Sequence, residues 1–142
     1  MSGSPEPIRG SCLCRAVTFT IAPPVLGMGH CHCSLCRRAH GTAFSTYCRI
    51  ATDGLVLLSG ADAVQDFVSS ATAVRQFCGR CGSKLFYRLQ ARSDTIWVAA
   101  GALDDDPGVR ATYHIFVADK AAWYDIPDAL PRYAGFPPGD GH

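Results

Sequence analysis

The sequence predicts a mainly β, single-domain protein with little helix, and three observations lead to this fold class. A chain of 142 residues is long enough to bury one core of its own. Short runs of alternating or β-branched residues recur along it, separated by turn residues. Its eight cysteines fall into groups with the spacing of metal ligands. A composition of 48% hydrophobic and 18% charged residues is that of an ordinary globular protein.

Strands account for most of the expected structure. Val17, Phe19 and Ile21 lie on one face of a strand expected over residues 16–21, which stops at Pro23-Pro24. Asp53-Gly54 predicts a hairpin turn, because this dipeptide favours tight turns between paired strands. The remaining strands are expected over residues 44–50, 55–58, 73–77, 84–89, 95–99 and 113–117.

Helix is expected only in short pieces. Residues 34–39 predict one or two turns that end at Gly41, since glycine is the usual helix stop. A second short turn is expected over residues 119–123. We expect a flexible N-terminal arm at 1–7, one domain over 8–136 and an extended, proline-rich tail at 137–142.

Several classes of partner are excluded by composition. The formal net charge is +1, and the longest run of basic residues is Arg37-Arg38, so we expect no nucleic-acid partner. No apolar run approaches the roughly 18 residues of a membrane helix, so we expect no membrane association. The first residues lack the basic and apolar segments of a signal peptide, which predicts a cytoplasmic protein. The oligomeric state is left open.

The dispersed cysteines predict a structural zinc site. Eight cysteines without an export signal favour metal binding over disulfides. Cys12-Leu13-Cys14 and Cys78-Gly79-Arg80-Cys81 together supply four thiols, which is enough to close a tetrahedral site. Gly79 and Gly82 are expected to allow a tight turn through positive φ angles. The alternative is a redox dithiol at Cys78 and Cys81, but the following residues read as a strand rather than a helix.

The compact cysteines predict a different kind of site. Cys31, Cys33 and Cys36 supply only three thiols, and catalytic zinc sites keep three protein ligands and one open position. A thiolate-rich zinc suits soft ligands, which favours chemistry at sulfur. The alternative is a closed structural site, with His40 or Cys48 as the fourth ligand. Cys48 otherwise reads as a small buried thiol.

Charged and titratable residues beside the compact cysteines are candidate catalytic groups. His30 and His32, with His40 as a further possibility, could move a proton near neutral pH. Arg37 could bind a substrate carboxylate. The alternatives are that His32 is a core residue and that Arg37 belongs to a solvated helix face.

Three motifs resemble those of a known family. They are the segments from Gly10 to Phe19, from His30 to Gly41, and from Phe77 to Gly82. With seven cysteines in the matching order, the chain resembles the glutathione-dependent formaldehyde-activating enzymes, which include centromere protein V. The resemblance continues through 114–117 and 123–127 and covers about residues 8–136.

The resemblance implies a β-tent fold of coiled antiparallel sheets and two zinc ions per chain. It assigns the structural zinc to Cys12, Cys14, Cys78 and Cys81, and the catalytic zinc to Cys31, Cys33 and Cys36. It implies a carbon–sulfur lyase whose small-molecule thiol is glutathione and whose product with formaldehyde is S-hydroxymethylglutathione. His114 is expected to be packed or hydrogen-bonded, and Trp123 to cover the sheet. The alternative function is a zinc-stabilised binding module without catalysis.

Overall fold

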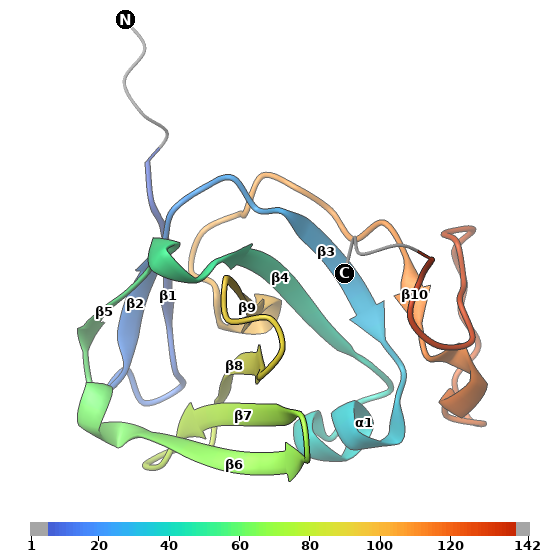
Figure 1. The fold of residues 1–142 in the computed structure, drawn as a ribbon, viewed down its shortest axis with the longest axis horizontal. Helices are drawn as coiled ribbons and strands as arrows, with labels where there is room; N and C mark the ends of the chain where they lie inside the picture. Colours follow the sequence, from blue (N-terminus) through green and yellow to red (C-terminus); the bar gives the residue numbers. More distant parts are fainter. Residues whose placement is uncertain (1–5, 139–142) are drawn as a thin grey trace, which may run out of the picture.

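The protein is a mainly β, single-domain fold of two sheets, as the sequence predicts (Figure 1). The computed structural model describes residues 6–138; the predictions for residues 1–5 and 139–142 lie outside this range. One sheet has the strand order β1-β2-β5, and the other has the order β10-β3-β4-β9-β8-β7-β6. The strands are β1 (Ile8–Ser11), β2 (Thr18–Ile21), β3 (Gly27–Cys31), β4 (Ser45–Ala51), β5 (Leu55–Ser59), β6 (Val64–Ser70), β7 (Ala73–Cys78), β8 (Lys84–Leu89), β9 (Thr95–Ala99) and β10 (His114–Ile115).

The main core lies between the two sheets. Phe19 and Ile21 of β2 are fully buried, together with Val17 just before the strand, as the alternation in the sequence predicts. They belong to the same packed cluster as Ile50 of β4 and Val98 of β9. Complete burial of each such side chain contributes about 1.5–3 kcal/mol, so this cluster is the main source of stability.

The opposite face of the seven-stranded sheet carries a second cluster. Side chains alternate between the two faces of a strand, so Tyr47 of β4 and Trp97 of β9 point away from the main core. They pack with Ala99 and with Cys36 of the helix. The sheet therefore has one face that stabilises the fold and one face that is available for a site.

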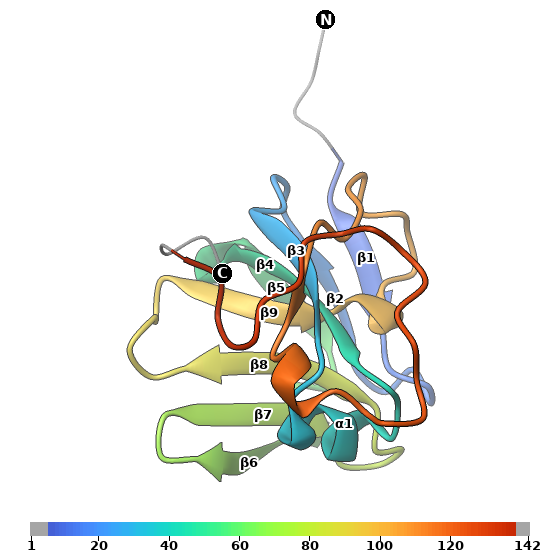
Figure 2. The same cartoon turned by 90° about the vertical axis from the view of Figure 1, so that its right-hand side faces the viewer.

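The single α-helix of the described range, α1 (Ser34–His40), forms where the sequence predicts it. The thiol of Cys33 caps its N-terminus by accepting a hydrogen bond from the backbone N–H of Cys36. Gly41 ends it with a φ of 65°, the left-handed conformation typical of a glycine stop. Figure 2 shows α1 and the chain that follows β10 on the same side of the molecule, the side that faces the viewer. No helix within residues 6–138 is long and apolar enough to cross a membrane.

Some elements differ from the sequence prediction. The prediction of a hairpin at Asp53-Gly54 was wrong. A turn is present there as a short 3-10 segment, but the strands on either side of it do not pair with each other: β4 pairs with β9, and β5 pairs with β2. The turn therefore passes from one sheet to the other. The strand expected over 113–117 is shortened to β10. The turn expected over 119–123 is present at residues 122–123, where the N–H of Tyr124 donates to the carbonyl of Ala121, and a 3-10 segment precedes it at Val117–Asp119. Trp123 does not cover the sheet, since it is 72% exposed.

Candidate functional site

The four dispersed cysteines come together at the junction of the two sheets. Their sulfur atoms all lie within 4.8 Å of one another. Cys12 and Cys14 belong to the turn after β1, while Cys78 ends β7 and Cys81 lies in the turn before β8. Four thiols at these distances match the donor set of a closed tetrahedral site for a soft divalent metal ion.

Local turns explain why these thiols converge. Arg15 has a positive φ of 65° and Gly82 has one of 81°, so both loops bend sharply beside their cysteines. Gly79 is not among the residues with positive φ, contrary to expectation. Ser83 links the loops, because its hydroxyl accepts a 2.8 Å hydrogen bond from the backbone N–H of Leu13. Its hydrogen bonds also lower the pKa of Cys81 to about 5.

The three compact cysteines form a second group, at the junction of β3 and α1. Cys31 ends β3, Cys33 caps the helix, and Cys36 lies in its first turn. Their sulfur atoms also lie within 4.8 Å of one another. Within residues 6–138, no histidine or carboxylate belongs to this group. The structure thus brings together every cysteine that the sequence assigns to a metal, in the two predicted sets.

The charge of the compact group favours a bound cation. Hydrogen bonds from Cys31 and Cys33 lower the pKa of Cys36 to about 2, and the nearby guanidinium of Arg75 adds to this effect. The contacts with Cys33 and Cys36 raise the pKa of Cys31. The contacts among the three sulfurs thus favour a thiolate at Cys36 and disfavour one at Cys31. A soft metal ion would let all three ionise, so the donor set fits such an ion.

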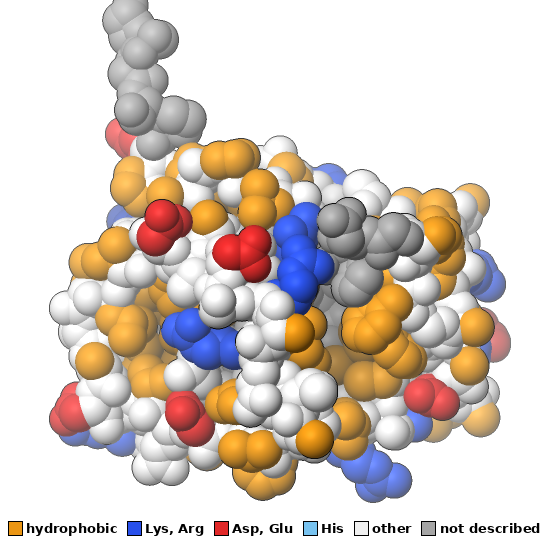
Figure 3. Space-filling view, viewed as in Figure 1, with side chains coloured by type: hydrophobic (Ala, Val, Ile, Leu, Met, Phe, Trp, Pro, Cys, Tyr) orange, Lys and Arg blue, Asp and Glu red, His pale blue; other side chains and the backbone are white. Residues whose placement is uncertain are grey.

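A cavity of about 290 Å³ opens beside the compact group. The three thiols form part of its wall, and six aromatic side chains form another large part. The space-filling view shows a hollow next to a group of hydrophobic side chains (Figure 3). The cavity is lined by Gly29, Cys31, Cys33, Ser34, Leu35, Cys36, Tyr47, Arg75, Tyr87, Leu89, Trp97, Tyr113, Ile115, Phe116, Asp119 and Phe136.

Three residues of one cross-strand row, Arg75, Tyr87 and Trp97, build the floor of this cavity. Arg49 of β4 is paired with Trp97 of β9, Trp97 with Tyr87 of β8, and Tyr87 with Arg75 of β7. Paired residues on neighbouring strands point to the same face, so these four side chains share the site face. The rings of Tyr87 and Trp97 meet edge to face at 5.9 Å, and the Arg75 guanidinium lies 5.0 Å from the centre of the Tyr87 ring.

Arg75 is the cavity residue whose position the sequence did not reveal. Its side chain is 7% exposed, and its Nη2 donates to the sulfur of Cys36 at 3.6 Å. Its Nη1 donates to the hydroxyl of Tyr47 at 3.5 Å, while its Nε has no hydrogen-bond partner. Buried arginines are rare unless they are paired. Arg75 contacts Cys36 and Tyr47, and its guanidinium still has N–H groups that these two contacts do not use.

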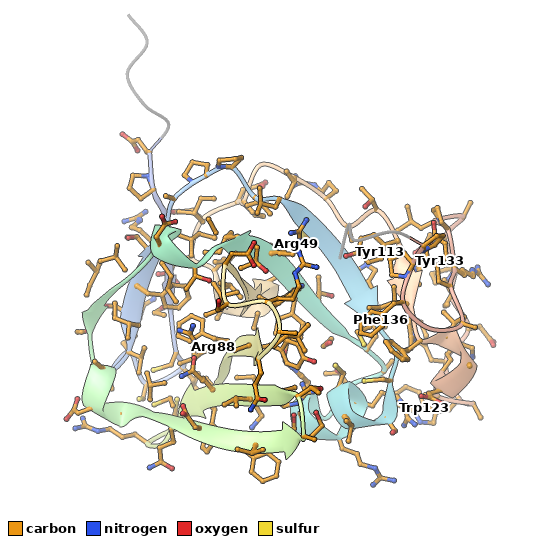
Figure 4. The ribbon with its side chains drawn as sticks, in the orientation of Figure 1. Arg49, Arg88, Tyr113, Trp123, Tyr133 and Phe136 are labelled. Carbon is orange, nitrogen blue, oxygen red and sulfur yellow. The ribbon has the colours of Figure 1, made fainter. Side chains whose placement is uncertain are left out.

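Gly29 allows the C-terminal segment to form the opposite wall. A Cβ atom at this position would lie 2.3 Å from the ring of Tyr113, so only glycine leaves room for that ring. Figure 4 shows Tyr113 and Phe136 beside β3, with Arg49 near Tyr113. The missing side chain of β3 thus lets an aromatic ring close over the strand.

The three candidate catalytic residues do not line the cavity. His30 and His32 alternate with Cys31 and Cys33 and point to the other face of the chain, where His30 contacts the hydroxyl of Thr46 at 2.7 Å. Arg37, on α1, is half-buried and is also absent from the lining. Their proposed roles in proton transfer and carboxylate binding stay predictions, without a contact to the cavity that would support them.

His32 belongs to a buried hydrogen-bonded chain. Asp128 accepts a 3.0 Å bond from Nε2 of His114, so Nδ1 of His114 accepts from Nε2 of His32, at 2.8 Å. Burial lowers the pKa of His32 to about 4, and its Nδ1 has no hydrogen-bond partner. His32 is therefore a neutral core residue, the alternative that the sequence left open. His114 is packed and hydrogen-bonded, as expected.

The two residues considered as a fourth ligand lie elsewhere. Nε2 of His40 and the hydroxyl of Tyr47 are 2.7 Å apart, and Tyr47 lines the cavity. Cys48 is fully buried on the core face of β4 and belongs to neither thiol group. The compact group thus has three protein ligands available within the described residues.

The fold and the two thiol groups define a small, mainly β protein with two cysteine sites that could hold metal ions. The sequence model of the glutathione-dependent formaldehyde-activating enzyme family matches residues 7–119. This match spans well over half of the chain, so the chain belongs to that family.

Individual relatives agree with this membership. A Halomonas elongata protein named for glutathione-dependent formaldehyde activation is 28% identical over 140 residues, covering 92% of this chain and 88% of its own. An Aspergillus flavus protein with the same name is 27% identical, and the match covers 88% of this chain but 58% of that longer relative. A Schizosaccharomyces pombe protein named an uncharacterized lyase is 23% identical and is covered to 84%. The crystal structure of a Rhodobacter sphaeroides protein shares the fold, with a TM-score of 0.58 at 24% identity over 72% of this chain and 90% of that one.

Proposed function

We propose that this chain is a zinc-dependent carbon–sulfur lyase that acts on the adduct of a thiol with a small electrophile. One observation carries the proposal: three thiols without a fourth protein ligand form part of the wall of a 290 Å³ cavity. The names of the family and of the relatives supply the two reactants, glutathione and formaldehyde, and the reaction that we propose is their combination to S-hydroxymethylglutathione.

The two thiol groups would have different tasks. Cys12, Cys14, Cys78 and Cys81 would hold a closed structural zinc, and Cys31, Cys33 and Cys36 an open catalytic one. A zinc ion in the open site would lower the pKa of a bound substrate thiol and so supply a thiolate at neutral pH. The sulfur contacts that lower the pKa of Cys36 and raise the pKa of Cys31 support this assignment, since a soft cation would stabilise thiolates at all three positions.

The reaction needs no oxidant. In the direction of synthesis, the thiol sulfur forms a bond with the carbonyl carbon, and the carbonyl oxygen takes up a proton to become a hydroxyl group. In the lyase direction, the carbon–sulfur bond breaks and the proton leaves the hydroxyl group. The aromatic walls would exclude water from the sulfur while this happens.

The proton would travel through Tyr47 and His40. The Tyr47 hydroxyl lines the cavity and lies 2.7 Å from Nε2 of His40. His40 is partly exposed and lines a second cavity, so a proton could pass from it to solvent. Arg75, which donates to both Cys36 and Tyr47, would hold this hydroxyl beside the thiol group.

The substitution Cys33→Ser tests the proposal. We expect the variant to bind one zinc instead of two and to lose thiol-adduct turnover by at least about 10²-fold, while it remains folded. Zinc content is measured by native mass spectrometry, folding by circular dichroism, and turnover by the rate of exchange between free and thiol-bound formaldehyde in NMR spectra. Exchange spectra also report the uncatalysed reaction, which is subtracted.

Cys48→Ala is the matched control, because Cys48 is also a cysteine of the site-bearing sheet but belongs to neither group. It is expected to keep both zinc ions and full turnover. Unimpaired turnover in Cys33→Ser would contradict the proposal. Two zinc ions without turnover in the unaltered protein would favour a zinc-stabilised binding module.

A further inference from the structure

Two charged side chains beside the cavity take part in no hydrogen bond or ion pair within residues 6–138. They are Arg49, which ends the cross-strand row of the floor, and Asp119, which lines the cavity. From their positions we propose that the site binds glutathione in one direction, with its glycine carboxylate on Arg49 and its γ-glutamyl ammonium on Asp119. The inference rests on the proposed function and adds the residues that select this thiol.

Arg75 is the cation of the cavity lining, but it already has partners. Its side chain is 7% exposed, and its Nη atoms donate to the sulfur of Cys36 and the hydroxyl of Tyr47. The positive charge of Arg75 therefore belongs to the thiol group. A carboxylate of the substrate needs a different cation.

Arg49 supplies such a cation at the end of the floor. It is half-buried and shares a strand face with its cross-strand neighbour Trp97, which lines the cavity. Of its three nitrogen atoms, only Nε is buried without a partner, so the two Nη atoms are accessible to a ligand. Figure 4 shows Arg49 near Tyr113, and comparison with Figure 1 shows that it lies far from α1.

The distance from the compact thiols to Arg49 matches one half of glutathione. Cys31 is paired with Ser45, and Gly27 is paired with Arg49. These two pairs are four residues apart along the strands, which corresponds to about 13 Å. The cysteinylglycine half of an extended glutathione spans about 7 Å, which leaves about 3 Å for a contact at each end. The glycine carboxylate can thus reach Arg49 while the sulfur is at the compact thiols.

Asp119 lies at the other end of the cavity. It is exposed and ends the 3-10 segment Val117–Asp119. It lines the cavity together with Ser34 and Leu35 of α1, and Figure 2 shows its segment, in orange, next to that helix. The two unpaired charges, Arg49 and Asp119, are therefore on different sides of the compact thiols.

This arrangement of charges sets the direction of the substrate. The ammonium of glutathione is on the γ-glutamyl residue, so it lies on the opposite side of the cysteine from the glycine carboxylate. With the glycine on Arg49, the ammonium is directed to Asp119. The reverse direction would place the glycine carboxylate beside Asp119, where the two negative charges repel. The γ-glutamyl carboxylate stays hydrated, because Asp119 is at the exposed end.

Three thiols test the inference in the zinc-loaded protein. They are glutathione, glutathione amide, in which the glycine carboxylate is a neutral amide, and deaminoglutathione, which lacks the ammonium. In calorimetric titrations without formaldehyde, we expect glutathione to bind at least about tenfold more tightly than the amide and about threefold more tightly than the deamino form. KM for turnover with formaldehyde is expected to follow the same order, with little change in kcat, since neither residue contacts the sulfur.

Arg49→Met separates the carboxylate from the rest of the thiol. We expect this variant to bind glutathione and deaminoglutathione at least about tenfold more weakly and to bind glutathione amide as before. Arg88→Met is the matched control and is expected to change none of the three affinities. Arg88 is in a strand of the same sheet, but it points to the other face and bonds Gln76.

Asp119→Asn separates the ammonium in the same way. We expect this variant to bind glutathione and its amide about threefold more weakly and to bind deaminoglutathione as before. Asp62→Asn is the matched control and is expected to leave all three affinities unchanged. Asp62 is also an exposed aspartate of a short 3-10 segment, Ala61–Ala63, but it does not line the cavity.

Several outcomes would overturn the inference. Equal affinities of the unaltered protein for glutathione and its amide would do so, and so would an Arg49→Met variant that weakens all three thiols equally. An Asp119→Asn variant that weakens deaminoglutathione as much as glutathione would overturn the direction of binding. The comparison of thiols in the unaltered protein does not depend on whether a variant folds. If no thiol is turned over, the proposed function fails, and the titrations still decide the inference.

Discussion

Replacing Cys78 by alanine is expected to remove one metal ion and to unfold the protein at 25 °C. The Cys78 sulfur is one of four that converge from the turn after β1 and from the two ends of the β7–β8 turn. Binding of a structural zinc ion contributes about 10–16 kcal/mol in small zinc domains, which is comparable to the whole stability of a domain. We therefore expect a loss of at least about 5 kcal/mol in the free energy of unfolding.

Cys48→Ala is the matched control for this variant as well. Both side chains are fully buried cysteines in strands of the same sheet, but only Cys78 belongs to a thiol group. Cys48→Ala is expected to cost about 1–2 kcal/mol and to keep both metal ions. Urea unfolding and zinc content together make the comparison. Equal losses of stability in the two variants would contradict a structural metal site.

Replacing Gly60 by alanine is expected to cost about 3–4 kcal/mol. Gly60 follows β5 with a φ of 77°, a conformation that costs other residues about 1–2 kcal/mol. Its Cβ would also lie 2.1 Å from the carbonyl oxygen of Ala16. Backbone atoms at this distance must move apart, which adds about 1–3 kcal/mol, the usual cost of overpacking.

Gly41→Ala isolates the conformational part of this effect. Gly41 has a φ of 65°, but no atom lies within 4 Å of its added Cβ. Its substitution is expected to cost about 1 kcal/mol. Urea midpoints of the two variants, measured with both metal sites loaded, give the difference. If Gly41→Ala is as costly as Gly60→Ala, the contact with Ala16 contributes nothing.

The fold was predictable where one face of a strand is buried. Val17, Phe19 and Ile21 alternate with polar residues, and this alternation identified the strand. The strand β3 was missed because Gly27 and Gly29 give no β signal; Tyr113 supplies the missing contact from 84 positions further along the chain. The strands β1 and β6 were missed too. β1 is very short, and in β6 the neighbouring apolar residues Phe67 and Val68 are both exposed, so the sequence of β6 does not alternate between apolar and polar residues.

The part of the candidate site that was predictable consists of residues that lie close together in the sequence. The spacing of Cys31, Cys33 and Cys36 is enough to place three sulfurs around one point, and the structure has them there. Arg75 has no such signal, because only the register between β7 and β8 brings it to the cavity. His30 and His32 were chosen as candidates because they lie next to the compact cysteines in the sequence. Side chains alternate between two faces along an extended chain, however, so both histidines point away from the face that carries the cavity.

The two thiol groups differ in how much of the chain must exist before they can form. Cys31, Cys33 and Cys36 all lie within six residues, so a ribosome releases this group as a unit early in synthesis. The other group needs Cys12 and Cys14 to wait until Cys78 and Cys81 have been made. If both groups hold metal ions, a growing chain would therefore complete the compact site first, and the other site would be complete only when the two sheets join.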